Sequence, residues 1–256
     1  MTNLPKITSK QREIINLIAR FRFLDRIQIQ KFLNHKDGAR INEWLKDLTE
    51  KEYLTRSYSS IFPENTKPAV YHLARNGIRY LKDQNEAKTV CKFYRENERS
   101  LSFVGSCLLL ANIYLDLEER SKGEIGFIVT VKSGYPTHRL ADLLSDLKPS
   151  AYIKQVRLKK SKYYFLELLS SLPPERLRQR LKKYLSFYES NEWEVETKKS
   201  FPTLLLICPD ETILIYVKRY LKRKINVLDE PALIIHLSTS QKVKEFGLTG
   251  DIWQSA

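Results

Sequence analysis

The sequence predicts a two-domain protein of mixed α and β structure, in which a small helical domain with a hairpin precedes an α/β domain with a central mixed sheet. Three observations predict it. Three short helical patterns occupy the first 50 residues, a β-hairpin pattern covers residues 151–169, and helices alternate with strands from there to residue 237. A chain of 256 residues is long enough for two small domains.

The three N-terminal helices have recognisable starts. Residues 8–20 carry apolar residues at helical spacing with Thr8 or Ser9 as the N-cap, a second helix follows Asp25, and Asp37 can cap a third. The core stripe of the third helix is Ile41, Trp44, Leu45 and Leu48. Strands at residues 53–58 and 70–73 then flank a polar loop, and this order is that of a winged helix-turn-helix, which we place at residues 1–85.

In a winged helix the third helix enters the major groove and the hairpin loop touches the DNA backbone. The expected DNA contacts are Lys36, Arg40, Asn42 and Lys46 near the third helix, and Arg56 and Lys67 in the wing. The same helix carries Glu43, Asp47 and Glu50, which weaken its positive field. Winged helices also serve as dimerisation or docking modules, so both uses stay open. We expect His72 to be structural.

The second domain is predicted at residues 90–256. Residues 90–120 read as helical, in one piece or in two broken near Gly105, and either are buried or supply a dimer contact. Strands are expected at 125–132, 151–158, 163–169, 203–208 and 233–237, and helices at 174–189 and 211–224. The last helix ends with the basic residues Lys218, Arg219, Lys222, Arg223 and Lys224.

Glu167 is the anomaly of the hairpin. Side chains alternate along a strand, so Glu167 shares a face with Tyr163, Phe165 and Leu169. A buried carboxylate is costly unless a cation or a hydrogen-bond donor pairs with it. Glu167 is therefore the first candidate site of this domain, and a structural role predicts a nearby Arg or Lys.

Composition favours a polyanionic partner. The net charge is +14, which predicts attraction to nucleic acid ahead of a membrane surface, and a protein that is simply basic is the plain alternative. The longest apolar run, Cys107 to Ala111, is too short to span a bilayer, and the N-terminus lacks a signal-peptide core. Three widely spaced cysteines indicate reduced thiols, so we expect a cytoplasmic protein without a membrane partner.

Several segments resemble the replication-relaxation family of plasmid and mobile-element proteins, over roughly residues 8–224. They are Gln11-Arg12-Glu13-Ile14-Ile15, Val70-Tyr71-His72-Leu73 with Gly77, Leu147-Lys148-Pro149-Ser150-Ala151, Phe165-Leu166-Glu167 and Leu181-Lys182-Lys183-Tyr184. The second domain also resembles the PD-(D/E)xK nucleases, the restriction-endonuclease-like α/β fold. That resemblance implies an aspartate after a proline on one strand and Glu-x-Lys on the next, with the carboxylates holding Mg²⁺.

This chain departs from the nuclease pattern. Ser150 follows Pro149 where the aspartate belongs, Glu167 fits the glutamate, and Leu169 stands at the lysine position. Asp146 or Asp142 could replace the carboxylate, and Lys182 or Lys183 the lysine, which leaves a Mg²⁺-dependent nuclease as an alternative. We expect instead that catalysis is lost and a basic surface retained, with Arg176, Arg180 and Lys183 as further DNA contacts.

The expected function is therefore a non-enzymatic DNA-binding protein of a plasmid, phage or similar element, acting in replication, maintenance or transcriptional control. The expected partner is double-stranded DNA, with a homodimer and replication or mobilisation proteins as further candidates. No metal site and no cofactor are expected, because the histidines lack ligand spacing and no Gly-rich phosphate loop is present. A metal-dependent nuclease and a protein-docking module are the alternatives.

Overall fold

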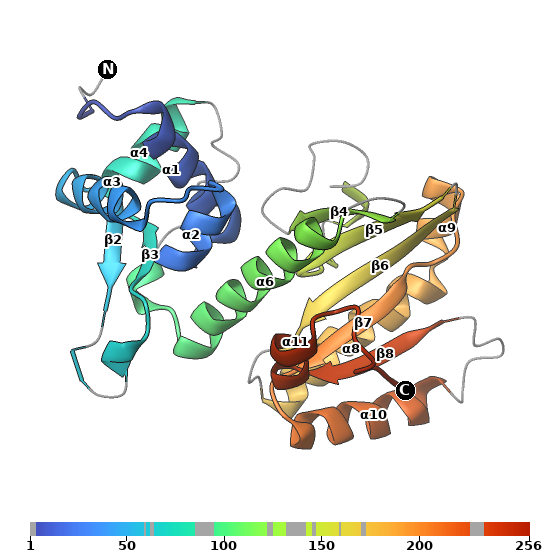
Figure 1. Ribbon diagram of the computed structural model, residues 1–256. Coiled ribbons are helices and arrows are strands. Elements are labelled where there is room, and N and C mark those ends of the chain that lie inside the picture. The colour runs from blue at the N-terminus through green and yellow to red at the C-terminus, as the bar shows by residue number, and fades with distance from the viewer. Residues whose placement is uncertain are drawn as a thin grey trace. The chain divides into compact units, whose positions relative to one another are not determined.

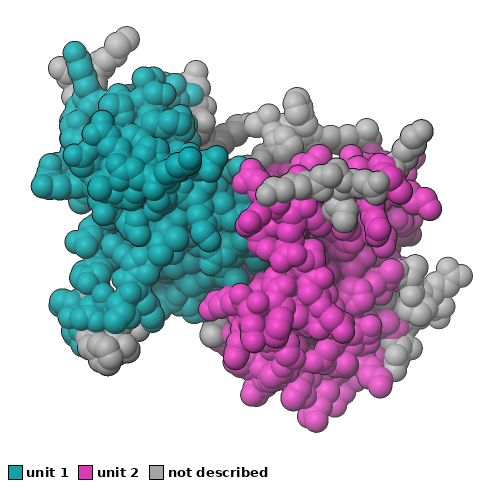
Figure 2. All heavy atoms as spheres, in the orientation of Figure 1, with its two compact units in different colours: residues 1–115 teal, residues 116–256 magenta. Residues whose placement is uncertain are grey.

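The structure is a computed structural model that describes residues 4–58, 60–61, 64–84, 95–121, 125–131, 142–144, 147–158, 160–169, 173–225 and 233–256. The chain forms two compact units, residues 1–115 and residues 116–256 (Figure 2). Each unit has its own sheet, one of three strands and one of six. The predicted class, a mixed α and β protein, is confirmed.

Up to residue 84, the described part of unit 1 combines four α-helices with a small antiparallel sheet (Figure 1). The helices are α1 (Ser9–Phe21), α2 (Arg26–Phe32), α3 (Gly38–Glu50) and α4 (Arg75–Asp83). The strands are β1 (Leu24–Asp25), β2 (Leu54–Ser57) and β3 (Val70–Leu73), in the order β1-β3-β2. Three helices precede a hairpin whose return strand also pairs with a short strand after α1, which is the element order expected of a winged helix-turn-helix.

Local signals in the sequence set these helix starts. Thr8 caps α1 in a reciprocal capping box with Gln11, and Asp25 caps α2 in the same way with Gln28. The side chain of Asp37 accepts hydrogen bonds from the backbone of Ala39 and Arg40 at the start of α3. All three N-terminal caps fall at positions that the sequence predicts.

Gly77 in α4 is required by close packing. A Cβ atom built on Gly77 would collide with the backbone carbonyl oxygen of Tyr53. The same carbonyl accepts a hydrogen bond from the backbone N–H of Ala74, so the residue before β2 and the residue before α4 are held together there. This contact gives a physical reason for a glycine in the segment that follows β3.

Helix α6 (Leu101–Arg120) extends unit 1 beyond the predicted boundary between residues 85 and 90. The side-chain amide of Gln28 donates to the carbonyl of Leu108 and to the side-chain oxygen of Asn112, both at 2.8 Å. The rings of Phe103 and Phe23 meet edge to face with centroids 6.1 Å apart. Through these contacts α6 packs on α2 and on Phe23, just before β1, and unit 1 extends to Leu115. The helix runs through Gly105 without a break.

Helix α6 is also, within the described residues, the one helix that is long and apolar enough by length and composition to cross a membrane. Only 28% of its most apolar 18-residue window is buried. Long apolar helices of soluble cores meet the same criterion, so this single helix is weak evidence for a membrane span.

Unit 2 is built on a six-stranded mixed sheet in the order β4-β5-β6-β7-β8-β9. The strands are β4 (Ile125–Val131), β5 (Ala151–Arg157), β6 (Lys160–Leu168), β7 (Thr203–Cys208), β8 (Ile235–Thr239) and β9 (Gln254–Ser255). Strands β4, β5 and β6 pair antiparallel, β7 and β8 add in parallel, and β9 closes the edge antiparallel. The predicted hairpin and the predicted central strand at residues 203–208 are confirmed.

Within the described residues, four helices between residues 174 and 246 flank this sheet (Figure 1). They are α8 (Pro174–Glu189), α9 (Glu192–Thr197), α10 (Glu211–Ile225) and α11 (Ser240–Phe246). Leucines of α8 and α10 and Trp193 of α9 share one apolar core with Phe165, Leu204 and Leu237 of the sheet. Helix α11 packs on β7 and β8. The side chain of Glu167 points from β6 toward the face that α8 covers, which places it at the edge of the core.

Candidate nucleic-acid interface and the Glu167 site

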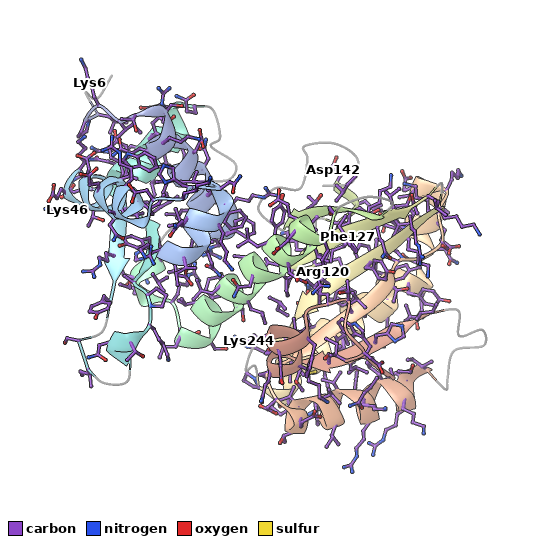
Figure 3. All side chains as sticks on the ribbon, in the orientation of Figure 1. Lys6, Lys46, Arg120, Phe127, Asp142 and Lys244 are labelled. Carbon is purple, nitrogen blue, oxygen red and sulfur yellow. The ribbon has the colours of Figure 1, made fainter. Side chains whose placement is uncertain are left out.

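The predicted groove-reading residues lie on an exposed surface of unit 1. Lys36, Arg40, Asn42 and Lys46 are all exposed, and Lys46 projects from α3 away from the body of the unit (Figure 3). The opposite side of α3 is buried through Ile41, Leu45 and Leu48. Helix α3 therefore presents the predicted side chains outward, as a recognition helix must.

The exposed charges of α3 are paired with each other. Arg40 Nη1 lies 2.7 Å from a carboxylate oxygen of Glu43, and Lys46 Nζ lies 3.8 Å from one of Glu50. These are contacts at i,i+3 and i,i+4 spacing on a solvent-exposed helix face, where such pairs contribute a few tenths of a kcal/mol each. The acidic residues thus reduce the positive field of α3 in the way that the sequence predicts.

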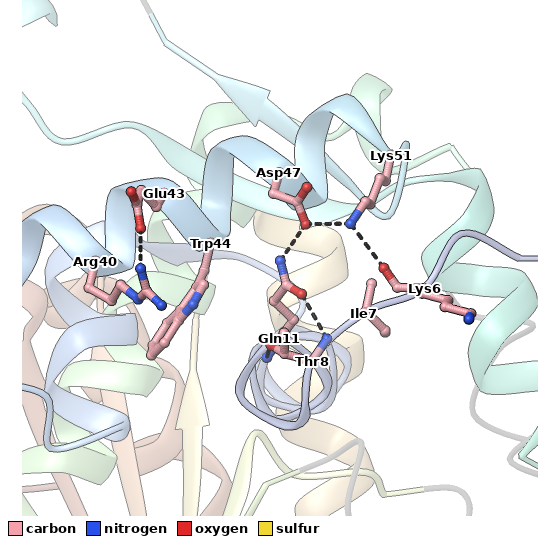
Figure 4. A pocket seen from close by; sticks show the side chains of 9 residues that line it. All are labelled: Lys6, Ile7, Thr8, Gln11, Arg40, Glu43, Trp44, Asp47 and Lys51. Carbon is pink, nitrogen blue, oxygen red and sulfur yellow. Dashed lines mark hydrogen bonds and ion pairs between the residues drawn. The ribbon is translucent and has the colours of Figure 1, made fainter.

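A second charge network holds α3 against α1 and the start of the chain (Figure 4). One oxygen of Asp47 accepts from Gln11 Nε2 at 2.6 Å and from Lys51 Nζ at 2.8 Å, and Lys51 also donates to the carbonyl of Lys6 at 2.9 Å. The hydrogen bond from Lys51 is the main cause that lowers the pKa of Asp47. These residues line an open depression of about 520 Å³, with Trp44 on its wall.

Trp44 differs from its predicted core position. It is half-buried, its ring contacts His35 with centroids 5.1 Å apart, and it borders the depression rather than the apolar core. Arg40 lies near its ring, 5.8 Å from the centroid. The apolar pattern of the helix did not separate this border position from the three core positions.

The wing residues and His72 lie in different environments. Arg56 is exposed and stacks over the ring of Tyr58 at 4.8 Å, and Lys67 is exposed in the loop. His72 is buried, and its Nε2 atom lies 2.6 Å from the side-chain oxygen of Asn97. Burial lowers the pKa of His72, so the neutral ring is favoured and a structural role fits.

In unit 2, Glu167 is buried and paired with Arg180 of α8. Two parallel hydrogen bonds of 2.7 Å join Arg180 Nε to Oε1 and Arg180 Nη2 to Oε2 of Glu167. The hydroxyl of Tyr184, one turn further along α8, donates to Oε2 at 2.8 Å. Bidentate pairing of this kind satisfies both oxygens and is among the stronger side-chain contacts in proteins.

Arg180 also joins the segment before β5 to the same cluster. Its Nη2 atom donates to the carbonyl of Lys148 at 2.9 Å, and Nη1 donates to the carbonyl of Leu147. Ser150 completes the cluster, because its backbone N–H donates to Glu167 at 3.3 Å and its hydroxyl accepts from the backbone N–H of Leu168 at 3.1 Å. One guanidinium thus fixes the start of β5, the end of β6 and the middle of α8.

These groups do not fit a Mg²⁺ ion. Both oxygens of Glu167 are held by a guanidinium, Ser150 offers only a neutral hydroxyl that already accepts a hydrogen bond, and Leu169 is buried at the lysine position. Asp142 is exposed (Figure 3), and Lys182 and Lys183 are exposed on α8, where neither pairs with Glu167. Asp146 lies outside the described residues. Across the described residues, no three metal-binding side chains gather.

Arg180 needs correction as a predicted DNA contact. Its side chain is 18% exposed and its guanidinium is used inside the domain, whereas Arg176 and Lys183 are exposed. The sequence indicates that Glu167 needs a cationic partner but does not identify it. The sequence feature that could have identified this partner is the spacing of Arg180 and Tyr184, which lie one turn apart on the helix predicted to cover this strand.

Comparisons with known proteins agree with part of this picture. The model of the replication-relaxation family matches residues 15–204. Two solved structures of ZitR from Lactococcus lactis, both of mutant forms, are 18% and 20% identical to this chain. They cover 48% and 46% of it and 80% and 77% of their own chains, with TM-scores of 0.28 and 0.27, too low to support an argument. No curated protein matches the chain.

Proposed function

This chain belongs to the replication-relaxation family, because the family model matches about three quarters of its length, and from that premise we propose that it is a DNA-binding protein. It would act in the replication, maintenance or transcriptional control of a plasmid, phage or other mobile element. Unit 1 would bind duplex DNA through α3 and the wing. Unit 2 would add phosphate contacts or a protein interface, without cutting the DNA.

The winged-helix arrangement of unit 1 supports the DNA-binding part of the proposal. Arg40, Asn42 and Lys46 are exposed on the helix that enters the major groove in such domains, and Arg56 is exposed in the wing. Arginine and asparagine can each form two hydrogen bonds to a base edge, so these positions suit direct readout. The pairs with Glu43 and Glu50 are exposed and would exchange readily for contacts with DNA.

The pairing of Glu167 with Arg180 carries the proposal that unit 2 is catalytically inert. The meander β4-β5-β6, then α8, then β7 parallel to β6 follows the element order of the PD-(D/E)xK nucleases, which supports a nuclease-like origin. Ser150 and Glu167 would occupy the positions of the two acidic metal ligands of these nucleases, and the two residues are hydrogen-bonded to each other. A permanently charged arginine neutralises the remaining carboxylate of Glu167. The site therefore offers a metal ion neither a net negative charge nor a free carboxylate oxygen.

A protein-docking module is the second candidate, and the charge pairing on α3 supports it. The basic residues of this helix are matched by carboxylates, and half-buried Trp44 borders an open depression. A nearly neutral surface with an accessible aromatic residue suits a protein partner as well as DNA.

The test is a gel-shift titration of the full-length protein with mixed-sequence duplex DNA at low salt, with and without Mg²⁺ or Mn²⁺. We expect a salt-sensitive shift and intact DNA under both conditions. Absence of binding at low salt would support the docking module instead. Metal-dependent cleavage that disappears in Glu167→Ala would contradict an inert unit 2.

A further inference from the structure

We propose that the exposed side of the helices α8 and α10 is a binding surface for the phosphate backbone of duplex DNA. This inference rests on the proposed DNA-binding function and assigns it a surface on unit 2. The surface is defined by seven residues of the two helices. They are Arg176, Arg178, Lys182 and Lys183 of α8, and Arg219, Lys222 and Arg223 of α10, all of them exposed.

The burial pattern of the two helices makes their basic residues face away from the sheet. Helix α8 buries Leu177, Leu181, Tyr184 and Leu185, and α10 buries Leu214, Val217 and Leu221, all in one core with the sheet. At 3.6 residues per turn, Arg219 and Arg223 fall opposite the buried stripe of α10, and Lys222 lies on the flank of the helix, roughly 100° from that stripe. Lys182 and Lys183 likewise lie off the buried stripe of α8.

Direct contacts join the two helices into one layer. The hydroxyl of Tyr216 on α10 lies 3.5 Å from the carbonyl of Pro174 at the start of α8. The same carbonyl of Pro174 accepts a hydrogen bond from Arg178 Nε at 3.4 Å. Arg178 therefore lies at the seam between α8 and α10, and the exposed charges on either side form one surface.

The charges of this surface are not neutralised by the described part of the chain. No described carboxylate pairs with Arg219, Lys222 or Arg223, and Glu211, the acidic residue of α10, pairs with Lys242 of α11 instead. On α8 the acidic residues Glu175 and Glu189 stand at the two ends of the helix. Basic residues in the last turn of α10 also complement the helix dipole, but that effect does not account for Arg219 or for the basic residues of α8.

Duplex DNA fits this surface better than a single strand does. Proteins that hold single strands combine basic grooves with exposed aromatic side chains on which bases stack. The one large apolar side chain that is exposed on α8 and α10 is Ile215, at 48%, within the described residues. A dense array of cations without a stacking platform matches the phosphates of a duplex, which carry one charge per about 1.7 Å of helix axis.

The test uses two variants of the full-length protein with equal net charge. The surface variant carries Arg219→Gln, Lys222→Gln and Arg223→Gln, and the control carries Lys198→Gln, Lys199→Gln and Lys244→Gln, three exposed lysines of unit 2 outside both helices (Lys244 is labelled in Figure 3). Affinity for mixed-sequence duplex DNA is measured against salt concentration, and circular dichroism checks that both variants fold.

We expect the surface variant to bind at least about tenfold more weakly than the wild type at about 50 mM salt, with a salt slope lower by roughly two to three. The control should lose less than about threefold. Equal losses in the two variants would overturn the inference. So would wild-type binding to single-stranded DNA that is as tight as its binding to duplex DNA. Failure of the wild type to bind duplex DNA would instead reject the proposed function itself.

Discussion

Helices α3 and α10 are both amphipathic and both carry exposed basic side chains, but they use these charges differently. On α3, Arg40 and Lys46 each have a glutamate of the same helix as a partner. On α10, Arg219, Lys222 and Arg223 have no carboxylate partner within the described residues. The partners of a charge, rather than the number of charges, therefore decide which surface is available to a polyanion.

We expect α3 and the α8–α10 surface to make different kinds of contact with DNA. Phosphate contacts provide affinity and position, while contacts with base edges provide specificity. A helix with paired, exchangeable charges and an exposed Asn42 suits base readout, and a helix layer with unpaired charges suits phosphates. Arg180 shows a third use of positive charge, since it is consumed inside unit 2 by Glu167.

The largest effect is expected from removing that internal charge. Arg180→Met leaves the buried carboxylate of Glu167 without its cation, so we expect a loss of about 3 kcal/mol in the free energy of unfolding. Glu167→Leu should lose a similar amount, and the double variant less than the sum of the two. Urea unfolding followed by tryptophan fluorescence measures all three. Losses below about 1 kcal/mol in both single variants would show that the pair is not a structural element.

A smaller effect is expected on α3. Arg40→Ala with Lys46→Ala should weaken binding to mixed-sequence duplex DNA by about two- to fivefold, since both charges are exposed and already paired. On a duplex chosen by selection from a random pool, the same variant should lose more, because base contacts are worth about 1–3 kcal/mol each. Fluorescence anisotropy with the two duplexes separates these losses. An unchanged affinity for both would show that α3 is not the groove-reading helix.

The reverse change on α3 should strengthen binding slightly. Glu43→Gln with Glu50→Gln releases Arg40 and Lys46 and removes two negative charges, so we expect affinity for mixed-sequence duplex to rise by about two- to fivefold. The matched control is Glu119→Gln with Glu245→Gln, which changes net charge equally at two exposed positions elsewhere. An equal rise in both variants would mean that net charge alone sets the affinity.

The smallest effect is expected from Asp47, the carboxylate that ties α3 to α1. Its pKa in the folded protein is lowered, chiefly by Lys51, so the unfolded chain takes up the proton first as the pH falls. Its stabilisation is therefore complete above the unfolded pKa near 3.8 and is lost as the pH falls through the folded pKa. Asp47→Asn should make the acid loss of stability shallower below about pH 4. A change in the free energy of unfolding that is the same at every pH would contradict this prediction.

Much of the fold follows from local signals in the sequence. The caps Thr8, Asp25 and Asp37 set helix starts through contacts within a few residues, and the prolines Pro173 and Pro174 mark the start of α8, so the sequence predicts these starts well. Helix α9 and the strands β1 and β9 were missed because they are two to six residues long and form through tertiary contacts. In α9, Trp193 is buried in the core of unit 2 and donates to the carbonyl of Ser200.

The candidate site was predictable only in part. The alternation of β6 shows that Glu167 faces inward, and burial then demands a cation. Periodicity gives the face of a helix but not which residue reaches across to another element, so Arg180 was placed among the surface charges. The same limit explains the domain boundary, since the hydrogen bonds from Gln28 that bind α6 to unit 1 join residues about 80 positions apart.

The most direct test of the account is lysine modification of the wild-type protein, with and without mixed-sequence duplex DNA, read by mass spectrometry. Each exposed lysine then reports whether DNA covers it, without any change to the chain. We expect strong protection of Lys182 and Lys222 on the α8–α10 surface and little protection of Lys244 on α11. Protection of Lys244 equal to that of Lys222, or no protection on α8 and α10, would contradict it.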